Sequence, residues 1–230
     1  MTIALAALTF LTAALDWAAV YRGWKRIELA AKPATMILLL GVVGAAGGWQ
    51  ALPLACFGLG LFFSLLGDIF LLVSFVRFSE RWFLPGLAAF LLAHLAYIAG
   101  LNIPLGEVSP FWMFTLALVL ALTARRALQR IVAGLRAKGL GRLVRPVVLY
   151  GFVITVMLLS ALLTLYRPDW SAGAAGLVSL GAILFYLSDL LLAWNKFVRP
   201  IRNGRLFNMV AYHLGQFALA AGMLLQFARG

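Results

Sequence analysis

Residues 52–76 read LPLACFGLGLFFSLLGDIFLLVSFV, an apolar run in which the only charged residue is Asp68. A run of this length predicts a membrane-spanning helix, because the hydrocarbon core of a bilayer needs roughly 20 apolar residues to be crossed. A carboxylate inside such a helix costs several kcal/mol unless it is paired, hydrated or protonated. Asp68 is therefore a candidate functional residue.

The composition extends this prediction to the whole chain. Of its 230 residues, 64% are hydrophobic and 11% are charged, which excludes the soluble globular class. We expect an all-α fold: a polytopic membrane protein with eight transmembrane helices in a single integral membrane domain. The spans are predicted near residues 2–21, 33–49, 52–76, 83–101, 109–123, 146–166, 172–195 and 206–227. The first span lacks a small-residue cleavage site, so we expect a retained helix.

The basic residues predict the orientation of the chain. Seventeen of the nineteen Lys and Arg lie after the first, third, fifth and seventh spans, and only Arg167 and Arg229 lie on the other side. The positive-inside rule therefore predicts that both termini are outside, in a membrane that we expect to be a bacterial inner membrane. Because these charges set topology, no nucleic-acid partner is expected. The single cysteine, Cys56, excludes an intrachain disulfide and a cysteine-based metal site.

A second acid, Asp189, lies behind a small residue in the apolar run GAILFYLSDLLLAW of residues 181–194. The order of basic, acidic and histidine residues repeats after four helices. The corresponding pairs are Lys32-Pro33 with Arg145-Pro146, Gly67-Asp68 with Ser188-Asp189, and His94 with His213. Four is an even number of spans, so the pattern predicts a parallel four-plus-four repeat about an axis along the membrane normal.

Depths counted from the nearest cytoplasmic charge place several polar residues in one layer. At 1.5 Å per residue, Asp16 lies about 9 Å into the membrane, Asp189 about 10 Å, His213 about 12 Å and Asp68 about 13 Å. We therefore expect the third and seventh spans to turn their acids into one polar cavity that opens to the cytoplasmic leaflet. Two acids in such a cavity form an acid/base pair, one protonated and one ionised.

Other polar residues within the spans are candidates for binding. Ser64 precedes Asp68 by one helical turn, and the remaining candidates share faces of the fourth and last spans: His94 and Tyr97, and Asn208, Tyr212 and Gln216. Interhelical hydrogen bonds, worth about 1 kcal/mol each, are the alternative explanation. Asp16 fits a structural pairing with Lys or Arg equally well, and His213 is expected to face away from the cavity. Lys32 precedes a proline where a helix is expected to begin, which indicates ordinary helix-start chemistry or a basic rim for a phosphate.

Five segments resemble recurring segments of the YhhN-like family, which includes the lysoplasmalogenases. They are Lys32-Pro33, Ser64-Leu-Leu-Gly-Asp68, Ala89-Phe-Leu-Leu-Ala-His94-Leu-Ala-Tyr97, Gly181-Ala-Ile-Leu-Phe-Tyr-Leu-Ser-Asp189 and Tyr212-His-Leu-Gly-Gln216. The first span and residues 124–145 carry none of this similarity. The resemblance implies an eight-helix membrane enzyme that hydrolyses the vinyl ether bond of lysoplasmalogens, releasing a fatty aldehyde and a glycerophospho-base. It implies a lysophospholipid substrate among membrane lipids, with no metal and no cofactor.

Vinyl ether hydrolysis begins when an acid protonates the β carbon, and a second carboxylate can then activate water. We expect Asp68 and Asp189 to share these roles, unassigned between them. The expected binding residues are Lys32, Ser64, His94, Tyr97, Asn208, Tyr212 and Gln216. The alternatives are a proton-coupled transporter of a small solute or lipid and a membrane protein that binds a partner. The sequence leaves the headgroup preference, the chain length and the oligomeric state open.

Overall fold

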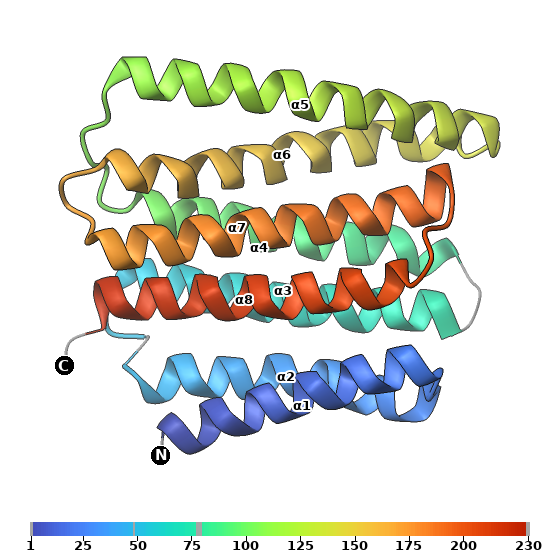
Figure 1. Cartoon of the computed structure of the whole chain (residues 1–230), viewed down its shortest axis with the longest axis horizontal. Helices are drawn as coiled ribbons and strands as arrows, with labels where there is room; N and C mark the ends of the chain where they lie inside the picture. Colours follow the sequence, from blue (N-terminus) through green and yellow to red (C-terminus); the bar gives the residue numbers. More distant parts are fainter. Residues whose placement is uncertain (1, 48, 77–79, 229–230) are drawn as a thin grey trace. The chain divides into compact units, whose positions relative to one another are not determined.

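The computed structural model describes residues 2–47, 49–76 and 80–228, which form helices and contain no strand (Figure 1). The long helices are α1 (Thr2–Arg22), α2 (Lys25–Ala45), α3 (Leu52–Val76), α4 (Phe83–Asn102), α5 (Pro110–Ala137), α6 (Val144–Leu163), α7 (Ala172–Ala193) and α8 (Gly204–Phe227). Short helical turns cover Glu80–Trp82, Gly141–Leu143, Thr164–Tyr166 and Trp194–Val198. Within the described residues, eight helices are long and apolar enough to cross a membrane. This confirms the predicted polytopic all-α membrane protein.

The chain divides into two compact units. The first contains residues up to Ile103 together with the end of α8 from Met223, and the second is Pro104–Gly222. One boundary falls between α4 and α5, where the four-plus-four pattern places it, and the other falls within α8, which the pattern does not predict. The symmetry between the halves, and the single membrane domain expected from the sequence, stay predictions.

The start of α2 differs from the sequence prediction. The helix begins at Lys25, so Pro33 lies inside it and Lys32-Pro33 does not mark its start. The cause is the tight turn at Gly23, which has a φ of 71° that glycine adopts without steric cost. The backbone N–H of Trp24 donates to the carbonyl of Ala19 at 2.8 Å and closes this turn, so α2 follows α1 almost directly. Figure 1 shows the two helices running alongside each other.

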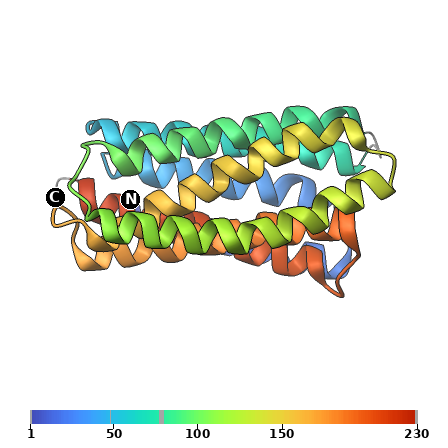
Figure 2. The same ribbon diagram turned by 90° about the horizontal axis from the view of Figure 1, so that it is seen from above.

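The end of α5 also differs from the prediction. The expected span stops at residue 123, with an interfacial continuation over residues 124–130 as the alternative, and the helix continues further, to Ala137. Its C-terminal half is basic yet amphipathic, and it buries Ile131 and Leu135. α5 packs along α6 within the second unit, and the two helices cross at an angle (Figure 2).

Glycines allow the closest helix approaches within each unit. In the first unit, a Cβ atom at Gly67 of α3 would lie 2.5 Å from the ring of Phe90 on α4, so any other residue there would displace this ring. In the second, a Cβ at Gly215 of α8 would lie 2.9 Å from the backbone nitrogen of Phe185 on α7. These contacts hold the helix carrying Asp68 against α4 and the helix carrying Asp189 against α8.

A buried arginine fixes the connection between α6 and α7. The Arg167 side chain is 3% exposed, and its guanidinium donates to both carboxylate oxygens of Asp169, at 3.1 and 2.6 Å, and to the carbonyl of Pro104 at 2.7 Å. The hydrogen bonds from Arg167 hold the pKa of Asp169 below its ordinary value of 3.8. Gly106 packs directly against this pair.

Candidate functional site

Asp68 forms a buried ion pair with Lys32 in the first unit. The Lys32 Nζ lies 2.8 Å from the Asp68 Oδ1, and the two side chains are 8% and 1% exposed. Lys32 lies seven residues beyond the first residue of α2, about 10 Å along the helix at 1.5 Å per residue, so its depth matches that of Asp68. The expectation that Lys32 stands at a helix start is therefore wrong, because α2 begins two turns earlier. The residue is an interior cation beside the acid.

The neighbouring turn of α3 brings Ser64 to Tyr97 of α4. The Ser64 Oγ and the Tyr97 hydroxyl lie 3.2 Å apart, and both residues are fully buried. The Tyr97 ring stacks on Phe57 at a centroid distance of 4.9 Å, which holds the hydroxyl in place. The contact joins α4 to α3 one helical turn from Asp68, and the predicted binding role of both residues stays a prediction.

His94 is also fully buried on α4. Its Nδ1 lies 2.6 Å from the carbonyl oxygen of Phe90, one turn earlier. A carbonyl oxygen only accepts, so Nδ1 carries the proton and donates, and in the neutral ring Nε2 is the acceptor. The ring is therefore held in one tautomer by its own helix.

Two further acids are buried in this unit, Asp16 on α1 and Glu28 on α2. The depth count identified Asp16 but did not include Glu28, which lies between the predicted spans 2–21 and 33–49. The signal that identifies Glu28 is its spacing of four residues from Lys32, which places both on one helix face. Among the described residues of the first unit, the buried charged side chains are Asp16, Glu28, Lys32 and Asp68.

Asp189 has different surroundings in the second unit, where it is half-buried on α7. The Tyr150 hydroxyl on α6 donates to its Oδ2, and the Ser188 hydroxyl donates to its Oδ1 at 3.4 Å. Tyr150 was missed from the sequence, because a tyrosine in an apolar helix resembles a packing residue. Its depth was the available signal: it follows Arg145 by five residues, about 8 Å, close to the depth of Asp189.

Helix α8 supports the acid-bearing end of α7. The Asn208 Nδ2 donates to the backbone carbonyl of Ser188 at 2.7 Å, directly before Asp189. Tyr212 packs edge-on against Phe185 of α7 at a centroid distance of 5.4 Å. Asn208, Tyr212 and Gln216 are all buried, as their common face predicts. His213, expected on another face, is also fully buried.

Asp68 and Asp189 thus lie in different compact units, and the expectation that they face one cavity stays a prediction. Among the described residues, no group of three or more His, Cys, Asp or Glu is arranged to hold a metal ion.

Comparison with known proteins places most of the chain in one family. Residues 27–223 match the YhhN family. The lysoplasmalogenase TMEM86B of Homo sapiens is 32% identical over 142 residues, which cover 62% of this chain and 54% of that protein. The protein of the same name from Sus scrofa is 31% identical over 186 residues, covering 81% and 69% of the two chains, and that of Mus musculus is 30% identical over 142 residues, covering 62% and 54%.

The matched segment thus spans about half the length of the human and mouse relatives. No solved structure matches this chain. The family match begins within α2 and ends within α8, so it includes Lys32, Asp68, Asp189 and Gln216. On this match, which covers most of its length, the chain belongs to the YhhN family.

Proposed function

We propose that this protein is a lysoplasmalogenase, a membrane hydrolase that cleaves the vinyl ether bond of lysoplasmalogens. The products are a fatty aldehyde and glycerophosphoethanolamine or glycerophosphocholine. The observation that supports this most strongly is the 31% identity over 186 residues to a lysoplasmalogenase, in a chain of the YhhN family. The buried acids on membrane-spanning helices add chemical support, because the reaction begins with a proton transfer in a lipid environment.

The reaction adds one water molecule across the vinyl ether. An acid donates a proton to the β carbon of the double bond, and the positive charge that results is shared between the α carbon and the ether oxygen. Water attacks the α carbon while a base accepts its proton, which gives a hemiacetal. The hemiacetal then collapses to the aldehyde and the free hydroxyl of the glycerol backbone. The enzyme therefore needs one proton donor and one carboxylate, as in paired-carboxylate glycosidases.

Asp68 suits the role of the carboxylate. The Lys32 ammonium group, 2.8 Å away, stabilises its ionised form. An ionised carboxylate can stabilise the cationic intermediate and accept a proton from the attacking water. Lys32 then acts as a positioning residue for the acid, and its contact with the headgroup phosphate stays a prediction.

Asp189 then supplies the proton. Its carboxyl group is half-buried, and the hydroxyl groups of Tyr150 and Ser188 orient it. The remaining polar residues are proposed to bind the headgroup and the attacking water: Ser64, His94, Tyr97, Asn208, Tyr212 and Gln216.

The proposal is tested by incubating the purified protein with an alkenyl lysophosphatidylethanolamine and measuring aldehyde release. The matched alkyl ether lipid, which lacks the double bond, should remain intact because it has no β carbon to protonate. In D₂O the released aldehyde should carry one deuterium at C2, because the transferred proton comes from an exchangeable carboxylic acid. Cleavage of the alkyl ether, or an aldehyde without deuterium, would contradict the mechanism.

The roles of the acids are tested separately. Asp68→Asn and Asp189→Asn should each abolish aldehyde release while the protein remains folded in detergent. Full activity in either variant would remove that acid from the proposal. Proton flux in proteoliposomes without aldehyde release would instead favour the proton-coupled transporter.

The distribution of Lys and Arg supports an orientation with both termini outside, and we propose that the membrane is a bacterial inner membrane. Reporter enzymes that are active only outside the cytoplasm, fused to either terminus, test this orientation. Activity of both fusions is the expected result, and inactivity of either one contradicts it.

A further inference from the structure

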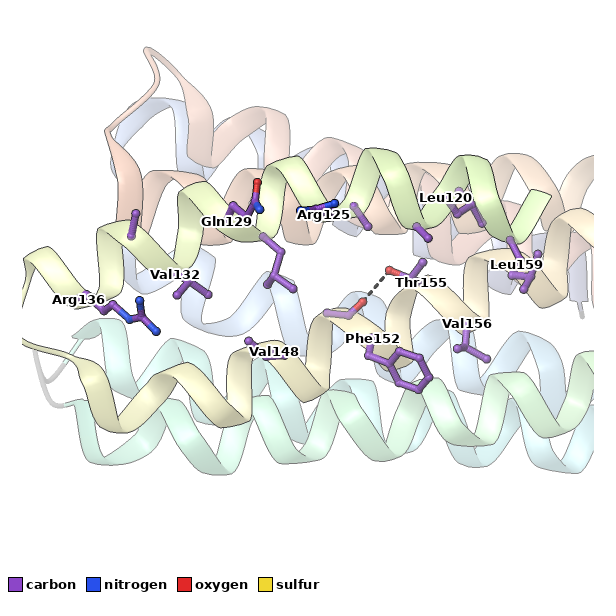
Figure 3. A pocket seen from close by; sticks show the side chains of 16 residues that line it. Leu120, Arg125, Gln129, Val132, Arg136, Val148, Phe152, Thr155, Val156 and Leu159 are labelled. Carbon is purple, nitrogen blue, oxygen red and sulfur yellow. Dashed lines mark hydrogen bonds between the residues drawn. The ribbon is translucent and has the colours of Figure 1, made fainter. Parts of the chain in front are cut away.

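A groove runs between α5 and α6 in the second unit (Figure 3). Its volume is about 750 Å³, within the range of roughly 300–1,000 Å³ that is usual for small-molecule sites. Its lining comes from these two helices alone. α5 buries little of its own surface, so the groove lies along an exposed face of this helix.

The basic residues of the groove are spread over one half of its length, between apolar residues, and the other half is apolar. Arg125, Gln129 and Arg136 line it from α5, at spacings of four and seven residues that place them on one helix face. Towards the other end, the walls are Leu120 of α5 and Val156 and Leu159 of α6, as Figure 3 shows. The half of the groove nearer the predicted cytoplasmic side is therefore polar in part, and the other half is apolar.

The apolar wall contains one hydroxyl, that of Thr155. It donates to the carbonyl oxygen of Gly151 in its own helix at 2.6 Å, so the hydrogen-bonding capacity of this donor is used within α6 (Figure 3). This part of the groove thus favours a hydrocarbon chain.

The groove is separate from the surroundings of Asp189. Gly151 and Phe152 of α6 line the groove, whereas Tyr150 is absent from its lining and contacts Asp189 of α7. An occupant of the groove is therefore on a different face of α6 from the proposed proton donor. Only some arginines of α5 line the groove. Arg125 and Arg136 do, whereas Arg126 and Arg130 do not.

We propose that this groove binds an anionic diacyl phospholipid of the cytoplasmic leaflet. The headgroup phosphate lies at the basic end, where arginine binds phosphate oxygens through paired N–H groups. An acyl chain lies along the apolar walls, and the anionic headgroup complements the two arginines. The bound lipid fills the space between α5 and α6 and so stabilises the second unit.

The test is thermal unfolding of the purified full-length protein in detergent, with phosphatidylglycerol or phosphatidylcholine of identical acyl chains added. Phosphatidylglycerol should raise the Tm of the wild-type protein by at least about 3 °C, because a ligand that binds only the folded state stabilises it. Phosphatidylcholine at the same mole fraction should have a smaller effect. The shift with phosphatidylglycerol should disappear in the double variant R125Q/R136Q.

The matched control is R126Q/R130Q, which removes the same charge from the same helix outside the groove and should keep the shift. A second variant, Ala121→Phe, fills the apolar part without touching the arginines and should also lose the shift. The proposal is overturned if the two lipids act alike, if the control loses as much as R125Q/R136Q, or if Ala121→Phe keeps the full response. The readout is thermal stability, so it is independent of whether the protein hydrolyses lysoplasmalogens.

Discussion

Replacing Lys32 with methionine keeps a long unbranched side chain but removes the cation that lies 2.8 Å from the Asp68 carboxylate. At this distance the attraction is about 6 kcal/mol for an effective dielectric constant of about 20. Taking each ion out of water costs several kcal/mol, which offsets most of this attraction. The intact pair therefore contributes little net stability, whereas a single removal leaves the burial cost of the other charge. We expect Lys32→Met to lower the unfolding free energy by about 3–5 kcal/mol.

The double variant distinguishes this explanation from simple loss of packing. Lys32→Met combined with Asp68→Leu replaces both charges of this pair with apolar groups, so neither member is left buried without the other. We expect its stability to lie within about 1 kcal/mol of the wild-type value, far from the sum of the two single effects. It should be folded and still release no aldehyde, because the proposed carboxylate is gone.

The measurement is unfolding in mixed micelles of a mild detergent and sodium dodecyl sulfate, followed by circular dichroism. Arg26→Met is the matched control, because it removes a cation from the exposed first turn of the same helix and should change stability by less than about 0.5 kcal/mol. A loss of less than about 1 kcal/mol in Lys32→Met, or additive effects in the double variant, would refute the buried and coupled ion pair.

Three further predictions concern the second unit. Tyr150→Phe removes the hydroxyl that donates to Asp189, and a hydrogen bond to a neutral carboxyl group is worth roughly 0.5–1.5 kcal/mol, so aldehyde release should fall about 2- to 10-fold with little change in Tm; unchanged release would exclude Tyr150 as a positioning residue. Gly106→Ala places a Cβ atom 2.5 Å from the Arg167 Nε and 2.6 Å from the Asp169 Oδ1, and this overpacking should lower the unfolding free energy by about 1–3 kcal/mol, seen as a lower Tm. Because the pKa of Asp169 is lower in the folded state than its ordinary value of 3.8, its pairing with Arg167 stabilises the protein fully above about pH 4 and is lost as the pH falls through the folded-state pKa. Between pH 5 and 2 the Tm of Asp169→Asn should therefore fall less than that of the wild-type protein, and equal slopes would contradict this.

The spans could be predicted from the sequence because a bilayer leaves the backbone few alternatives to a helix. The two large errors have one cause, which is that charged residues end a hydropathy run without ending a helix. Lys25 and Arg26 begin α2, and Arg125 lies well inside α5, because helical hydrogen bonding continues in water and at the interface. Capping and turn residues marked these limits better than hydropathy, as Gly23 shows.

Residues of the candidate site could be predicted from the sequence where their side chains are energetically costly to place in a membrane. Asp68 and Asp189 stand out for that reason, and Ser64 was found through its spacing from Asp68. Tyr150 was not found, because a tyrosine is common in membrane proteins and its depth, close to that of Asp189, was not counted. The Lys32–Asp68 pair was missed although both residues were candidates, because Pro33 suggested a helix start and placed the lysine at the rim.

The two acids share a sequence context but not a chemical environment. Lys32 and Arg145 occupy matching places in the repeat, yet Lys32 is buried beside Asp68, whereas Arg145 is exposed and Asp189 accepts a hydrogen bond from Tyr150. Two acids in identical surroundings would have similar proton affinities and would compete for one role. An ammonium ion lies beside one acid and a phenol beside the other, so the two acids have different surroundings in which to take different roles in the proposed hydrolysis. The proposed hydrolysis needs two acids in different surroundings. The different neighbours of the two acids, Lys32 and Tyr150, therefore fit this reaction better than two identical halves would.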